Sequence, residues 1–144
     1  MATDPLDINS LVAAADAPWN GMPAGTTIGH VHLHVGDIGQ ASAFYSESLG
    51  FDRIAWSYPG ALFLSAGGYH HHLGTNTWAG RAPGPAPDEA QLLQWTVRIP
   101  DDATRMALAE NLARAGHAAR VNETGLEIQD PWGTQIRFEI EPAR

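Results

Sequence analysis

The sequence predicts an α+β fold built from two βαβββ repeats, which form a curved, cup-shaped mixed sheet with the helices outside. Two observations predict this fold. Each half of the chain has the order strand, amphipathic helix and three short strands. Equivalent positions also keep a nearly constant separation: His30 and Gln94, Gly50 and Gly116, and Gly68 and Gly133 lie 64, 66 and 65 residues apart.

The chain begins with a predicted arm, residues 1–25, in which prolines and glycines surround a possible short helix near residues 8–15. The first repeat, about 26–78, belongs to a single domain predicted over 26–144. It starts with a strand at 28–35 and an amphipathic helix from about residue 38, which Gly50 closes. Its three further strands are predicted at 52–58, 61–65 and 69–75.

A linker over residues 79–89 separates the repeats, because its prolines and glycines cannot continue a sheet. The second repeat, about 90–144, starts with a strand at 92–99. An amphipathic helix follows Asp101 and Asp102 and is closed by Gly116. The last three strands are predicted at 118–122, 126–129 and 134–140.

Composition narrows the class of protein. The formal net charge is −8 with only eight Lys and Arg, so a nucleic-acid partner is not expected. The absence of cysteine excludes disulfides and thiolate metal sites. Because the amino terminus has no basic leader and no long apolar run, we predict a cytoplasmic protein without membrane contact. We also expect a small-molecule substrate and a homodimer, with the arm as a candidate for wrapping or dimerisation.

Six of the seven histidines fall in two short runs, at residues 30–34 and 70–72. Histidine and apolar residues alternate from His30 to Val35 in the strand at 28–35, so His30, His32 and His34 share one face and the apolar residues between them share the other. Aligned imidazoles suit a divalent metal or acid/base chemistry. The alternative is an edge strand whose polar face meets water.

The same alternation predicts polar faces on the strands at 92–99 and 134–140. The repeat places the second histidine run on the fourth strand, with His71 directed toward the helices. If the polar faces curl together, they line one cup, whose predicted members are His30, His32, His34, His70, His72, Gln94, Arg98, Arg137 and Glu139. A polar-lined cavity is the usual place for a ligand, and the alternative is again a solvated sheet face.

Three segments resemble the vicinal oxygen chelate superfamily, which includes glyoxalase I, extradiol dioxygenases and bleomycin-resistance proteins. They are Ile28-Gly29-His30-Val31-His32-Leu33, the helix end Phe44-Tyr45 to Leu49-Gly50-Phe51, and the turn Asp130-Pro131-Trp132-Gly133 before Ile136-Arg137-Phe138-Glu139. More narrowly, residues 66–78 look like the carboxy-terminal half of catechol 2,3-dioxygenase-like proteins, and residues 3–7 look like their interdomain linker. Those relatives carry a further, amino-terminal pair of repeats, so one hypothesis is a half that works only with another chain.

The resemblance implies a divalent ion (Fe, Mn, Ni or Zn) held by His30, Gln94 and Glu139. Gln94 stands where extradiol dioxygenases have a histidine, although its carbonyl oxygen can still bind, as glutamine does in some glyoxalase I sites. The catalytic candidates, as base or hydrogen-bond donor, are His72, His34 and His32. The candidates for substrate binding are His70, Arg98 and Arg137.

Two functions follow as hypotheses. The first is a metal-dependent enzyme that chelates two adjacent oxygens of a small substrate, for catechol-like ring cleavage or a related isomerase or lyase reaction. The second is a non-catalytic protein that binds or sequesters an antibiotic-like molecule and has a degenerate metal site. In that case Trp56 and Trp78 would flank the binding groove, whereas Trp95 is predicted to lie in the core.

Overall fold

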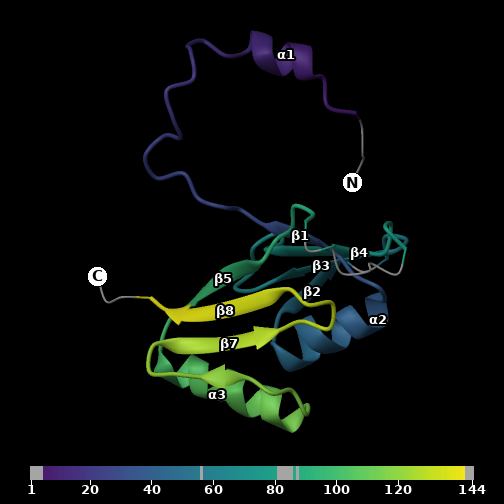
Figure 1. Cartoon of the computed structure of the whole chain (residues 1–144), viewed down its shortest axis with the longest axis vertical. Coiled ribbons are helices and arrows are strands. Elements are labelled where there is room, and N and C mark those ends of the chain that lie inside the picture. The colour runs from purple at the N-terminus through teal and green to yellow at the C-terminus, as the bar shows by residue number, and fades with distance from the viewer. Residues whose placement is uncertain (1–4, 56, 81–85, 87, 142–144) are drawn as a thin grey trace.

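The computed structural model describes residues 5–55, 57–80, 86 and 88–141, and it consists of two four-stranded sheets (Figure 1). The first sheet contains β1 (Val31–His34), β2 (Asp52–Ala55), β3 (Ala61–Ser65) and β4 (Leu73–Asn76). The second contains β5 (Gln94–Ile99), β6 (Arg120–Val121), β7 (Gly125–Gln129) and β8 (Gln135–Ile140).

The two sheets have the same topology. The strand orders are β1-β4-β3-β2 and β5-β8-β7-β6, and in each sheet the first and last strands of the repeat pair in parallel. The predicted α+β fold with two βαβββ repeats is therefore confirmed. The sheets stay separate, with β1 and β5 as edge strands.

Aspartate caps mark the starts of the two main helical segments, and glycines mark their ends. Asp37 caps α2 (Ile38–Ala41) and Asp101 caps α3 (Asp102–Arg114), each by accepting a backbone N–H three residues ahead. Gly50 and Gly116 follow the two helical segments with φ of +86° and +78°, a conformation that glycine adopts without strain.

The first helix differs from the prediction in its winding. After α2 the chain continues as a π-helix, η1 (Ser42–Ser48), in which the Leu49 amide bonds to the Phe44 carbonyl five residues back. This wider winding accompanies burial of the neighbouring residues Phe44 and Tyr45.

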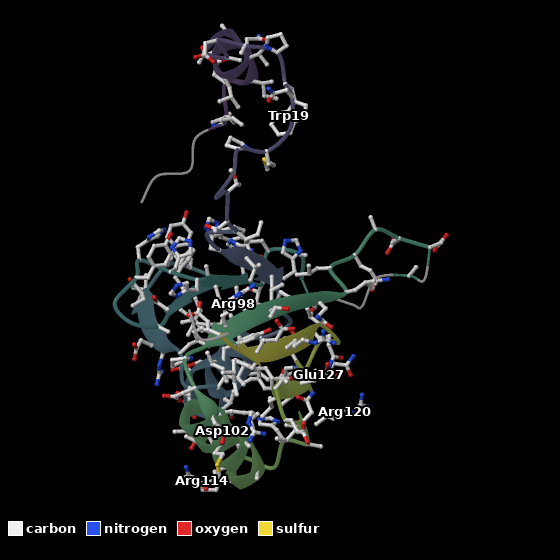
Figure 2. The ribbon with its side chains drawn as sticks, turned by 90° about the vertical axis from the view of Figure 1, so that its left-hand side faces the viewer. Trp19, Arg98, Asp102, Arg114, Arg120 and Glu127 are labelled. Carbon is white, nitrogen blue, oxygen red and sulfur yellow. The ribbon has the colours of Figure 1, made fainter. Side chains whose placement is uncertain are left out.

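The arm stands away from both sheets. All its described residues, 5–25, are exposed, and so is the short helix α1 (Ile8–Ala13) (Figure 1). Trp19 is 75% exposed and lies on the part of the arm that projects from the domain (Figure 2). Residues 1–4, Trp56 and most of the predicted linker (81–85 and 87) lie outside the described residues. No helix in the described ranges is long and apolar enough to cross a bilayer.

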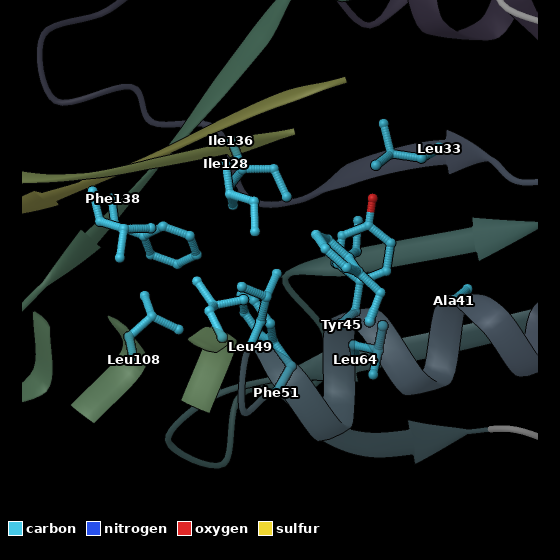
Figure 3. Packing of buried hydrophobic residues seen from close by; sticks show 14 of the residues in the cluster. Leu33, Ala41, Tyr45, Leu49, Phe51, Leu64, Leu108, Ile128, Ile136 and Phe138 are labelled. Carbon is cyan, nitrogen blue, oxygen red and sulfur yellow. The ribbon is translucent and has the colours of Figure 1, made fainter. Parts of the chain in front are cut away.

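One apolar core lies between the sheets and the helices (Figure 3). It combines residues of both repeats, among them Leu33, Tyr45, Leu64, Leu112 and Ile136. Burial alternates along β5 and β8 as predicted, with Val97 and Phe138 on the packed faces and Arg98 and Arg137 on the opposite ones. Alternation along the predicted strand at 92–99 also places Leu93 on the packed face, which is wrong, because Leu93 precedes β5 and is 71% exposed.

A buried hydrogen bond joins the repeats. Tyr45 lies on η1, and Asp130 lies in the turn between β7 and β8. The Tyr45 hydroxyl donates a hydrogen bond to Asp130 Oδ2 over 2.6 Å. The other carboxylate oxygen of Asp130 accepts the Trp132 and Thr134 amides. Burial, followed by the nearby Asp130 carboxylate, raises the pKa of the Tyr45 hydroxyl, so tyrosine remains the donor.

Candidate functional site

A cavity of about 250 Å³ lies where the edge strands of the two sheets approach each other. We call it the seam cavity. It is lined by Ile28, Gly29, His30, Val31, Phe51, Ala66, His72, Trp95, Thr96, Val97 and Arg98. Three sequence-predicted site residues therefore meet here: His30 from the entry to β1, His72 from the entry to β4, and Arg98 from β5.

His72 is held by the loop that precedes it. Its Nδ1 accepts the Ala66 amide over 3.2 Å, and the Ser65 hydroxyl lies at the same distance. Because Nδ1 is the acceptor, the neutral ring carries its proton on Nε2. Within the described residues this Nε2–H has no hydrogen-bond partner, which leaves it available to a ligand.

The two histidine runs form one cluster beside the cavity. The His71 ring centroid lies 4.6 Å from those of both His30 and His70, and Tyr69 lies 4.6 Å from His72. Burial, together with the surrounding histidines, lowers the pKa of His71. A neutral imidazole such as that of His71 offers one hydrogen-bond donor and one acceptor.

The predicted direction of His71 toward the helices is wrong. Strand β4 begins only at Leu73, after a turn in which Gly67 and Gly68 have φ of +64° and +78°. The three consecutive histidines therefore precede the strand, and strand alternation does not apply to them. His71 instead packs against His30 and Phe63 on the histidine-bearing face.

His32 occupies a separate, well-defined position on the same face. Asn76 Oδ1 accepts the Trp78 amide over 3.1 Å, so Asn76 Nδ2 faces His32 Nε2 at 2.7 Å and donates to it. The neutral ring therefore carries its proton on Nδ1. Partial burial, with His30 and His34 nearby, lowers the pKa of His32.

The glycine at position 74 makes room for this ring. A Cβ atom at Gly74 would lie 2.8 Å from His32 Nδ1, closer than packed atoms approach. His34, two residues further along β1, is exposed.

The second sheet uses its polar face for ion pairs. Arg137 donates to Glu127 Oε1 through both Nε (2.9 Å) and Nη2 (2.7 Å), and its Nη1 lies 3.7 Å from Glu139. Arg120 also approaches Glu127, at 3.8 Å. Arg137, which was predicted to bind the substrate, therefore already pairs with carboxylates of its own sheet.

The three predicted metal ligands line three different hollows. His30 lines the seam cavity, Gln94 lines a hollow with Arg120 and Gln129, and Glu139 lines a third with Arg137. Nitrogen and oxygen donors of this kind suit the implied ions. Across the described part of the chain, no group of three or more His, Asp or Glu is placed to hold an ion, and the ligand set stays a prediction.

Comparison with known proteins agrees with the fold. Residues 27–138 match the Glyoxalase/Bleomycin resistance protein/Dioxygenase superfamily. The chain belongs to this superfamily. A catechol-2,3-dioxygenase from Bacillus subtilis (strain 168) is 43% identical over 145 residues, which cover 97% of this chain and 50% of that protein. The chain therefore spans about half the length of this relative.

Solved structures of the superfamily share the fold at low sequence identity. A glyoxalase/dioxygenase from Nostoc punctiforme has a TM-score of 0.65 and 14% identity, with 88% of this chain and 100% of that chain covered. TnmS3, an antibiotic binding protein from Streptomyces sp. CB03234, has a TM-score of 0.58 and 23% identity, with 84% and 100% covered. These similarities show the superfamily fold and leave the reaction to be argued from the site.

The structure adds site residues that the sequence reasoning missed. Asn76 bonds to His32, and the Ser65 hydroxyl lies within hydrogen-bond distance of His72. The Tyr69 ring contacts the His72 ring, and Glu127 pairs with Arg137. Glu127 could have been found, because the apolar residues on either side of it in β7 predict that it shares the polar face. Asn76 and Ser65 end β4 and β3, so their contacts depend on how these strands pair, and the contact of Tyr69 depends on the turn before β4. Periodicity in the sequence indicates neither the strand pairing nor the turn conformation.

Proposed function

We propose that the protein is an enzyme of the superfamily that acts on a small substrate with two adjacent oxygens. The reaction would be a catechol-like ring cleavage or a related isomerase or lyase reaction. The observation that carries the proposal is the seam cavity, in which the imidazoles of His30 and His72 meet an apolar wall formed by residues such as Phe51 and Val97.

The size and chemistry of the cavity support a small, flat substrate. Pockets for drug-sized ligands commonly occupy about 300–1,000 Å³, so a smaller cavity suits a single ring. The Nε2–H of His72 can donate to a substrate oxygen, while the apolar residues exclude water from the ring. The relative named catechol-2,3-dioxygenase supports an oxygenated ring as substrate, although this chain matches half of that protein.

A divalent ion is part of the proposal only as the cofactor that the family resemblance implies. When bound, such an ion would act as a Lewis acid on two substrate oxygens. The residues that the resemblance assigns to this ion, His30, Gln94 and Glu139, line separate hollows. The chain's own residues bind and orient the substrate.

The second candidate is a protein that binds its ligand without catalysis. Two points favour it: the resemblance places a ligand histidine where this chain has Gln94, and the three predicted metal ligands line separate hollows. The neighbour TnmS3 is described as an antibiotic binding protein, and we extend that property to this chain only as a proposal. We also propose a homodimer, which light scattering after size exclusion would test.

One experiment separates the two candidates. The protein is purified without chelator, its metal content is measured, and oxygen uptake and absorbance are followed with catechol. The enzyme proposal expects a bound ion and turnover that EDTA abolishes, with both reduced in Glu139→Ala and retained in the exposed control Glu123→Ala. Binding of catechols or aromatic antibiotics that EDTA does not affect, without turnover, would support the binding protein and overturn the enzyme proposal.

A further inference from the structure

Among the described arginines, Arg98 stands apart because its guanidinium makes no ion pair or hydrogen bond within the described residues. Arg105, Arg120 and Arg137 each approach a carboxylate, and Arg114 donates to an asparagine. Figure 2 shows Arg98 well apart from Arg120, which lies beside Glu127.

The strand register places the carboxylate of Glu139 on the strand next to Arg98. Arg98 pairs in register with Glu139 across the parallel strands β5 and β8, so both side chains start from the same sheet face only one strand apart. Glu139 nevertheless approaches Arg137, and it lines a different hollow from Arg98. Arg98 lines the seam cavity at the edge of its sheet instead.

The polar side chains at the surface of the seam cavity, which are those of His30, His72, Thr96 and Arg98, can all donate hydrogen bonds. Arg98 supplies up to five N–H groups, and His72 supplies a free Nε2–H. None of the residues that line the cavity is Asp or Glu, although the chain as a whole has a formal net charge of −8.

A donor-rich, partly apolar cavity of this kind favours an anion with an apolar body. We propose that the substrate of the seam cavity carries a carboxylate on a small ring, and that Arg98 is the residue that selects it. The planar guanidinium matches a carboxylate through two parallel hydrogen bonds, and the ring packs against Phe51 and Val97. This inference rests on the proposed function and names the substrate class of the same site.

The test compares three probes by isothermal titration, with Trp fluorescence as a second readout: catechol, 3,4-dihydroxybenzoate and benzoate. We expect the dihydroxybenzoate to bind about ten- to a hundredfold more tightly than catechol, since a charge-assisted pair adds about that much. Arg98→Gln should remove this difference, and Arg98→Lys should keep a part of it. The matched control is Arg120→Gln, an exposed arginine on the same sheet outside the cavity, which should leave the preference unchanged.

The outcomes distinguish this inference from the proposed function. If catechol and dihydroxybenzoate bind equally, or if Arg98→Gln retains the preference, the carboxylate inference is overturned while the catechol-like substrate stands. If benzoate binds in an Arg98-dependent manner and the vicinal hydroxyls add nothing, the inference is supported and the proposed reaction is overturned. If inorganic phosphate competes as well as benzoate, the site is a general anion site and the ring specificity is overturned.

Discussion

Removal of the Tyr45 hydroxyl tests whether the two repeats are joined by a charge-assisted hydrogen bond. In Tyr45→Phe, Asp130 Oδ2 loses its donor at 2.6 Å in a site where Tyr45 is fully buried and Asp130 is 6% exposed. Hydrogen bonds to charged groups contribute roughly 1.5–3 kcal/mol, and Asp130 keeps two backbone donors. We therefore expect the free energy of unfolding to fall by about 2 kcal/mol, which corresponds to about 4–8 °C in Tm.

Urea unfolding followed by circular dichroism measures this loss, with the m-value expected to stay unchanged. Tyr58→Phe is the matched control, because within the described residues the Tyr58 hydroxyl makes no hydrogen bond, and it should change stability by less than about 0.5 kcal/mol. Asp130→Asn and the double variant complete a mutant cycle. A coupling energy near zero, or a Tyr45→Phe loss no larger than that of the control, would refute the reasoning.

Four further outcomes are expected. Gly74→Ala should displace the His32 ring and lower stability by about 1–3 kcal/mol, seen in Tm and in the histidine NMR signals. Gly125→Ala should fail to fold, because its Cβ would lie 2.0 Å from a backbone carbonyl oxygen, and soluble expression checks this. Deletion of residues 1–25 should leave Tm within about 2 °C, since no described residue of the arm is buried. The pKa of His71 is lowered in the folded state, so just below pH 6.5 the unfolded chain binds more protons than the folded chain. The free energy of unfolding should therefore fall as the pH drops below 6.5, and its dependence on pH should be weaker in His71→Gln.

The fold was predictable because its signals are periodic. Alternation in β5 and β8 fixed the buried faces, and the glycines at 50 and 116 marked the helix ends. The π-helical winding of η1 was not predictable, since apolar spacing does not distinguish five-residue from four-residue hydrogen bonding over seven residues.

The site was predictable only in part. Strand alternation correctly put the histidines of β1 on one face, but it failed for His71 because β4 starts at Leu73. Alternation also says which face a residue occupies and not which neighbour it contacts. Arg137 and Arg98 both lie on the polar face of an alternating strand. In the structure, however, Arg137 pairs with Glu127, whereas Arg98 lines the cavity. Such choices depend on the distances between strands.

The open edges of β1 and β5 have a mechanical consequence. Across the described residues, no backbone hydrogen bond links the two sheets, so side-chain contacts, among them the core packing and the Tyr45–Asp130 hydrogen bond, set their spacing. Packed side chains can slide by small steps, whereas a hydrogen-bonded ladder breaks when it is sheared. A small shift of one sheet relative to the other would therefore change the width of the cavity between His30 and Arg98 while leaving the hydrogen bonds within each sheet intact.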